Sequence, residues 1–370
     1  MSALSCPRLR GLVWQALALA AVVALGWFLI GNAAGNLARG SVASGFDFLA
    51  RPASFAIGET IIPYSAADSY GRALLVGVLN TLKVTAIAIV LSTLVGLLVG
   101  VARLSSNWLV AKLAAAYVET VRNVPLLLQL FLWYAVITES LPGPRLALHP
   151  LPGVFLCNRG LMLPGLAEHP VWPAMAVALL VGLVAAWLLR GRGPRWLGAA
   201  LIAGLPAAVW LGFGAPLAFS LPELRGFNFQ GGVVFSPELS ALLLGLVIYA
   251  GSYIAEIVRG GILAVSRGQI EAGLSLGMSR AQILRLIVLP QALRVIVPPL
   301  AGEYHKLTKN TSLAVAIGYP DLVSVLNTMI NQTGQAIEGV ALIMAVFLVI
   351  SLGISLFMNW YNRRVALVER

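Results

Sequence analysis

The sequence predicts an all-α membrane protein, a polytopic helix bundle of about eight transmembrane helices. Hydrophobic residues make up 59% of the 370 residues and charged residues only 11%, and the mean hydropathy is +0.90. Most of such a chain has to lie in lipid, where helices satisfy the backbone hydrogen bonds within one segment. Apolar runs of spanning length occur at residues 11–31, 74–101, 113–137, 172–190, 195–219, 239–261, 293–318 and 339–361.

The first apolar run follows Arg8 and Arg10, as the core of a signal peptide would. It is about 20 residues long, whereas such a core has roughly 7–15, so we expect a retained first helix. Residues 1–74 therefore read as one N-terminal helix and an outer segment. Cys6 and Cys157 are predicted on opposite sides of the membrane, so no disulfide between them is expected.

The net charge of +11 does not indicate nucleic-acid binding, because the basic residues are dispersed at the ends of the apolar runs. With the N-terminus inside, 15 Lys and Arg residues fall in inner segments, 6 in outer segments and the remaining 4 within spans. The excess on one side predicts that both termini are cytoplasmic.

A block at residues 138–238 reads as an insertion into a simpler bundle. It contains two strongly apolar helices joined by the basic turn Arg-Gly-Arg-Gly-Pro-Arg-Trp. The outer segments 32–73 and 138–171 are rich in Gly, Pro, Ser and aromatic residues. They are predicted to be ordered loops that lack a core of their own.

The segment from Ser266 to Arg294 is amphipathic and lies between two spans. Ser266 with Gln269, and Ser279 with Gln282, each have the spacing of a capping box at a helix start. Gly277 lies between them, where a helix end favours a residue that tolerates positive φ. The pattern predicts a helix, a sharp turn and a second helix.

The prolines at positions 290, 298 and 299 are expected to prevent one uninterrupted helix from this segment into the next span. Isolated helices shorter than ~12–15 residues are marginal in water, so the short first helix must pack on something. The residues leave three alternatives open: a helix lying on lipid headgroups, one that packs on the cytoplasmic end of the bundle itself, or one that contacts another protein.

The same segment resembles the coupling loop of the permease subunits of ABC importers. The family pattern is Glu-Ala-Ala, three residues, Gly, nine residues, Ile-x-Leu-Pro, and this chain departs from it once, with Gly273 for the second alanine. Residues 118–134, 250–262 and 307–318 resemble the polar amino-acid uptake branch, the histidine/glutamine-type permeases. In length and extra spans the chain is most similar to general L-amino-acid permeases. The matching coupling-loop positions are Glu271, Ala272, Gly273, Gly277, Ile287, Leu289 and Pro290.

The resemblance implies an ABC type-1 permease domain at residues 75–361, with a core of five helices. The N-terminal helix and the inserted pair are additions, residues 265–290 form the cytoplasmic coupling loop, and residues 362–370 form a cytoplasmic tail. It further implies an importer of L-amino acids in a bacterial inner membrane. Its partners would be a cytoplasmic ABC ATPase dimer, a second identical or related permease, and a periplasmic amino-acid-binding protein.

In that family Glu271 would meet a basic residue of the ATPase, and Leu274 and Leu276 would help fill its groove. The chain has no Gly-x-x-x-x-Gly-Lys-Ser/Thr motif for a nucleotide phosphate. We therefore expect no catalytic residue and no cofactor bound by this chain, with ATP and Mg²⁺ held by the partner ATPase.

Charged residues within spans need partners or an aqueous lining. Lys83 is placed near a span end, where it can reach the interface. Glu119 and Arg122, like Glu256 and Arg259, are three residues apart and are predicted to form structural ion pairs within helices.

The candidate pore or substrate residues are polar positions in two proline-containing spans. Pro125 should bend its span, which places Gln129 a turn further in as a candidate that faces the pore. The span after the coupling loop is polar on one side and reads as the lining of an aqueous path or as a subunit interface. Its candidates are Glu303, Lys306, Lys309 and Asn310.

Two other classes remain as alternatives. An ion-coupled secondary transporter of small polar solutes would also need buried charges, but it leaves the coupling-loop pattern unexplained. An intramembrane enzyme would need clustered catalytic side chains, and His149, His169 and His305 have no spacing that suggests a metal site.

Overall fold

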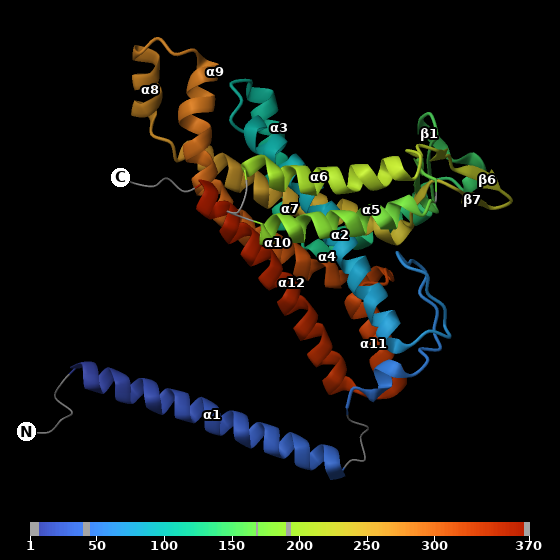
Figure 1. Ribbon diagram of the computed structural model, residues 1–370. Coiled ribbons are helices and arrows are strands. Elements are labelled where there is room, and N and C mark those ends of the chain that lie inside the picture. The colour runs from blue at the N-terminus through green and yellow to red at the C-terminus, as the bar shows by residue number, and fades with distance from the viewer. Residues whose placement is uncertain (1–6, 40–44, 168, 190–193, 366–370) are drawn as a thin grey trace, which may run out of the picture. The chain divides into compact units, whose positions relative to one another are not determined.

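The computed structural model describes residues 7–39, 45–167, 169–189 and 194–365, and most of them are helical (Figure 1). Among these described residues, five helices are long and apolar enough to cross a membrane, and a pair bent by 103° at residues 124–125 forms a sixth candidate span. Val13–Leu29 and Trp196–Gly212 are shorter apolar helices. The prediction of an all-α membrane bundle is confirmed.

The first of two compact units comprises residues 1–86 and 261–370. It holds the first half of α2, and α10 packs along α12 in this unit (Figure 1). Its elements are α1 (Pro7–Arg39), η2 (Asp47–Ala50), α2 (Tyr70–Ala102), α8 (Arg267–Ser275), α9 (Arg280–Ile283), η5 (Leu284–Val288), α10 (Leu289–Asn310), η6 (Thr311–Ile317), α11 (Leu322–Thr333) and α12 (Ala336–Val365).

The core of this unit includes part of the outer segment that precedes α2. Phe48 and Ala53 are buried together with Tyr70 of α2 and with Leu322 and Met329 of α11. The sequence predicts that residues 32–73 lack a core of their own, and the described part, from residue 45, shares one with three helices. Its apolar side chains are spaced too irregularly for helix or strand periodicity to reveal this packing.

The expectation that prolines interrupt the helix after the coupling loop is wrong. Pro298 and Pro299 lie inside α10, and Pro290 lies in its first turn. The chain is helical from Arg280 onward, with a π-helical turn at Leu284–Val288. A π turn widens the helix just before Pro290, which relieves the clash that a proline ring makes with the preceding turn.

The second compact unit comprises residues 87–260. It holds the second half of α2 and nearly all of α7, and the inserted α5 and α6 pack closely on each other. Besides its part of α2, the elements of this unit are α3 (Trp108–Asn123), α4 (Leu126–Ala135), η3 (Val136–Ser140), η4 (Pro144–Leu146), β1 (Leu148–Leu151), β2 (Val154–Cys157), β3 (Gly160–Leu163), β4 (Gly165–Leu166), α5 (Val171–Leu188), α6 (Arg195–Gly212), β5 (Phe219–Ser220), β6 (Glu223–Arg225), β7 (Asn228–Gln230), β8 (Val233–Phe235) and α7 (Pro237–Leu263).

The inserted outer segments form short strands, where the sequence predicts loops. Strands from both sides of the α5–α6 pair build a four-stranded sheet in the order β1-β2-β3-β8. Cys157, a free thiol, is buried there with Met162 and Phe229, so the segment has a small core of its own. Cys6 lies outside the described residues.

Candidate functional site

The segment between α7 and α10 folds as a helix, an elbow and a second helix, as the sequence predicts (Figure 1). Gly277 has a φ of 74°, so the prediction of a residue with positive φ at this position is confirmed. The Met278 amide donates to the Gly273 carbonyl at 3.1 Å, and the Gly277 amide donates to the Leu274 carbonyl at 2.9 Å. These bonds satisfy the last carbonyls of α8 and fix the elbow locally.

Only the second of the two predicted capping boxes forms. The Ser279 hydroxyl accepts from the Gln282 amide at 3.3 Å, and the Gln282 side chain accepts from the Ser279 amide at 2.8 Å. Ser266 precedes α8 but makes no side-chain capping bond. Gln269 instead accepts a hydrogen bond from Gln291 of α10, which joins α8 to the start of the following helix.

Gly273, the single departure from the family pattern, is buried where α8 packs on the next helix. A Cβ atom at this position would lie 3.0 Å from side-chain atoms of both Ile283 and Ile287. Two isoleucines therefore occupy the space that an alanine methyl group would need, which accounts for the glycine.

We expect Gly273→Ala to leave the thermal stability of the protein nearly unchanged. The alanine gains about 1 kcal/mol of helix propensity but requires small shifts of Ile283 and Ile287, and the two effects oppose each other. Gly273→Leu should lower the melting temperature by several degrees, measured by thermal unfolding of the purified protein. Equal melting temperatures for these two variants would contradict the packing described.

The elbow exposes two leucines close to one carboxylate on an otherwise polar surface. Leu274 is 52% and Leu276 81% exposed, and Glu271 and Ala272 are also exposed. Leu289 is exposed as well, whereas Ile287 and Pro290 are half-buried. Exposed leucines gathered on a short polar-flanked helix are typical of a protein contact surface.

Glu256 and Arg259 form the predicted ion pair within α7. Glu256 also accepts from Arg103, which follows the last residue of α2, so one carboxylate lies between two guanidinium groups. The sequence gives no signal for this third member, because Arg103 lies 153 positions from Glu256.

The predicted pair of Glu119 and Arg122 is absent from the described part of the chain, where no ion pair joins these residues. The Arg122 guanidinium instead lies 4.8 Å from the centroid of the Tyr253 ring of α7. A guanidinium over an aromatic face is stabilised by it, and the charge of Arg122 also acts on Glu256 of α7, so spacing along α3 alone mispredicts its partners.

Gln129 is buried and bonds to the backbone of its own span. It is buried at 6% exposure, and its amide donates to the carbonyls of Val121 and Val124, each at 3.0 Å. Pro125 stands at the break between α3 and α4, where helical bonding is interrupted. Gln129 therefore bonds to the Val124 carbonyl at the break and adds a second bond to the Val121 carbonyl, which also accepts from the Val124 amide at 3.4 Å.

The candidate residues on α10 lie on a polar stretch of that helix. Glu303 pairs with Lys306 at 2.6 Å, with side-chain exposures of 13% and 60%. Lys309 is exposed and Asn310 half-buried. His305, which lies on another face of α10 from Glu303 and Lys306, contacts Ser355 of α12 at 3.1 Å.

Lys83 has a specific partner, where the sequence suggests only that it reaches the interface. It pairs with Glu59 of the outer segment. Asn80, one turn earlier on α2, donates to the carbonyls of Glu59 at 2.8 Å and Pro320 at 2.9 Å. These contacts join the outer segment, α2 and the turn before α11 in one polar network.

Asp321 caps α11 from a fully buried position, outside the candidate spans. One carboxylate oxygen accepts from the Ser324 amide at 2.8 Å, and the other has no hydrogen-bond partner in the described structure. Burial raises the pKa of Asp321 to about 6, although backbone N–H groups oppose the shift.

We expect Asp321→Asn to stabilise the protein at both pH 5 and pH 8, and about twice as much at pH 8 as at pH 5. A carboxyl with a raised pKa favours the folded state below its unfolded pKa of 3.8 and loses that contribution as the pH rises through about 6. The shift corresponds to about 3 kcal/mol as an upper bound, and asparagine retains the helix cap. Thermal unfolding at both pH values tests this, and an equal effect at pH 5 and pH 8 would refute it.

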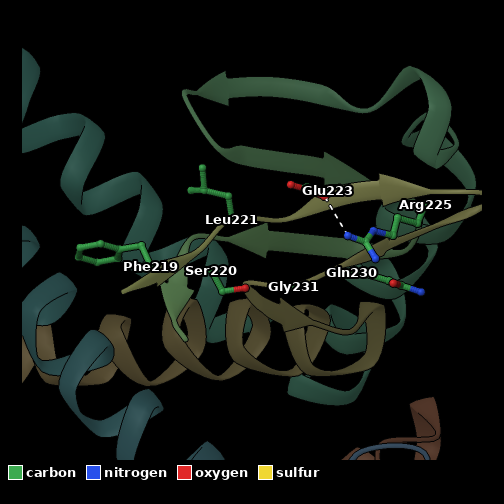
Figure 2. Close-up of a pocket in the computed structure, with 7 residues that line it drawn as sticks. All are labelled: Phe219, Ser220, Leu221, Glu223, Arg225, Gln230 and Gly231. Carbon is green, nitrogen blue, oxygen red and sulfur yellow. Dashed lines mark hydrogen bonds and ion pairs between the residues drawn. The ribbon is translucent and has the colours of Figure 1, made fainter. Parts of the chain in front are cut away.

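One further cavity, of about 360 Å³, lies in the strand region (Figure 2). Glu223 and Arg225, which line it, form an ion pair at 3.3 Å in which both side chains are 67% exposed. Phe219 and Leu221 at its edge are also exposed. The cavity is therefore a surface depression, and it contains none of the candidate site residues.

The described residues contain no group of three or more His, Cys, Asp or Glu side chains that could hold a metal ion.

Comparison with known proteins gives consistent results. Residues 178–367 match the family described as binding-protein-dependent transport system inner membrane component. A putative amino-acid ABC transporter permease of Escherichia coli K12 is 48% identical, over 98% of this chain and 96% of that protein. A general L-amino acid transport system permease of Rhizobium johnstonii is 45% identical, over 100% and 95%. A glutamate/glutamine/aspartate/asparagine transport system permease of Rhodobacter capsulatus is 37% identical, over 98% and 92%.

Proposed function

Because this chain belongs to the family of binding-protein-dependent transport system inner membrane components and is an amino-acid ABC importer permease, we propose that α8 and its elbow are the point where a separate ATPase drives it. The chain is a multi-pass membrane protein and a transport component. A transport component without a nucleotide-binding motif of its own needs a partner that supplies the driving force, and an exposed surface must receive that partner.

The exposed elbow is the observation that carries this proposal. A helix of nine residues cannot be stable alone, yet α8 leaves Leu274 and Leu276 uncovered while its buried side packs on α9 and η5. Exposed leucines around Glu271 suit a groove that supplies apolar walls and one basic group. The proposed occupant of this surface is one subunit of a cytoplasmic ABC ATPase dimer.

The proposed orientation has both termini and the elbow in the cytoplasm, in agreement with the distribution of basic residues. The strand region and the segment before α2 then lie on the periplasmic side, where an amino-acid-binding protein delivers substrate. One permease core of five helices lines half of a pathway, so a second permease, identical or related, completes it. The chain itself binds no ATP or Mg²⁺ in this proposal.

The test uses the complete complex in liposomes, with the amino-acid-binding protein outside and ATP inside. Uptake of labelled L-amino acids should require hydrolysable ATP and should continue when an ionophore dissipates ion gradients. A complex that imports without ATP, or that stops when the gradients are dissipated, would instead be an ion-coupled transporter. Cross-linking from Leu276→Cys should capture the ATPase subunit, and its absence from the product would refute the assigned contact.

A further inference from the structure

The charge cluster of Arg103, Glu256 and Arg259 connects two helices. Arg103 donates to one oxygen of Glu256, and the Arg259 side chain donates to both oxygens, with its Nε at 3.2 and 3.3 Å. The side-chain exposures are 15% for Arg103 and 31% for each of the other two residues. Arg259 lies on the same helix as Glu256, so only Arg103 carries the interaction across to α2.

The two helices are in backbone contact just above this cluster. A Cβ atom on Gly96 of α2 would lie 2.5 Å from Ile254 of α7, and one on Gly100 would lie 2.7 Å from the Ala255 carbonyl oxygen. Glycines four residues apart are typical of close helix–helix approach in membranes. The side chains of Ile254 and Val258 are seated against these glycines, and this packing sets how near the two helices lie.

An ion pair adds a charged link to this packing. Between the described halves of α2 and α7 in this unit, no ion pair other than Arg103–Glu256 joins the two helices. It lies at the end of α2, after Ala102, and on α7 seven residues before Leu263. Along the chain, α8 begins four residues after α7 ends.

We propose that Arg103 is a positioning residue for transport, which holds the end of α2 to Glu256 so that α2 follows α7 when α8 is driven. This inference rests on the proposed function, because it presupposes that force enters at α8. Arg259 has a different role, since it orients the Glu256 carboxylate within one helix. The cluster determines how much of the movement of α7 during each ATP hydrolysis cycle is transmitted to α2.

The chain provides a matched control. Arg103→Gln and Arg259→Gln remove the same group from the same carboxylate, but only the first breaks the contact between helices. The measurement is the number of ATP molecules hydrolysed per amino acid imported by the complete complex in liposomes. Arg103→Gln is expected to raise this ratio at least fivefold, while its ATP hydrolysis rate stays within twofold of the wild type; Arg259→Gln should change the ratio less than twofold.

The conservative variant Arg103→Lys retains a positive charge and should restore most of the wild-type ratio. Equal ratios for Arg103→Gln and the wild type, or an equal rise for Arg103→Gln and Arg259→Gln, would overturn the inference. So would an Arg103→Gln complex that fails to assemble while Arg103→Lys transports normally, because Arg103 would then serve stability alone. If the wild-type complex itself shows no ATP-dependent uptake, the proposed function fails. Wild-type uptake is measured in its own sample, so this failure is distinguished from a failure of the inference about Arg103.

Discussion

Glu271→Lys is expected to abolish ATP-dependent amino-acid uptake while the protein remains in the membrane in normal amount. Glu271 is exposed on α8, and its backbone carbonyl, rather than its side chain, accepts the Ser275 hydroxyl at 3.0 Å. Reversing its charge therefore leaves the fold intact. At an interface that meets the carboxylate with a basic group, the new lysine creates like-charge repulsion worth several kcal/mol.

A free-energy change of about 1.4 kcal/mol corresponds to tenfold, so uptake should fall at least about tenfold, measured with labelled amino acid in the complete complex. Glu271→Gln, which removes the charge without reversing it, should lose less. The melting temperature of the purified permease should be the same for all three proteins. Uptake by Glu271→Lys within twofold of the wild type would show that the carboxylate meets no basic partner.

Gly277→Val is expected to produce the second large loss of uptake, for a reason that involves the backbone. Gly277 has a φ of 74°, a region that a β-branched residue adopts only as an outlier. The left-handed conformation costs an L-residue about 1–2 kcal/mol, and valine exceeds this because its branched Cβ crowds the neighbouring carbonyl. The elbow would open, and α8 would no longer be held at the angle that its hydrogen bonds define.

Gly277→Asn is the matched control, since asparagine tolerates positive φ better than other side chains. Nothing lies within 4 Å of a Cβ atom at this position, so neither variant meets a steric obstacle from neighbouring residues. Uptake should follow the order Gly, Asn, Val. If Asn and Val reduced uptake equally, the side chain itself would be the cause, and the backbone argument would be wrong.

Sequence reasoning predicts the elbow well because its determinants are local. The Ser279–Gln282 capping box and the positive φ of Gly277 each depend on residues within one turn. Helix positions in the membrane are similarly local, since they follow from apolar runs of spanning length. The capping box expected at Ser266 fails because Gln269 finds a partner 22 positions away, in Gln291.

The partners of charged groups are much harder to predict, because they depend on which helices meet. Spacing along α7 predicts Glu256–Arg259 but contains no information on Arg103. The same spacing along α3 mispredicts Arg122, which finds the Tyr253 ring of another helix instead. Lys83 and Glu59 lie 24 positions apart across an irregular segment, beyond any periodic rule.

In the insertion too, contacts between segments far apart in the sequence determine the structure, and the local sequence pattern does not reveal them. Its strands have two to four residues each, and β3 pairs with β8 across the whole α5–α6 pair. Such short strands contain too few residues for alternation to be recognised. Buried Cys157 and Met162 show that the segment nevertheless forms an interior.

The burial of Phe48 and Ala53 against α11, next to bonds from α2 to the same region, has a consequence for how the newly made chain folds. Tyr70 bonds to Gln332, 262 positions later, and Thr81 receives the Leu322 amide from 241 positions away. At synthesis rates of roughly 5–20 residues per second, α11 is made on the order of 10–50 seconds after residues 45–69. The apolar side chains of that outer segment remain unburied during this interval. During that interval it is a natural client for chaperones and a target for proteases, and ribosome stalling before α11 should make it the first site of cleavage.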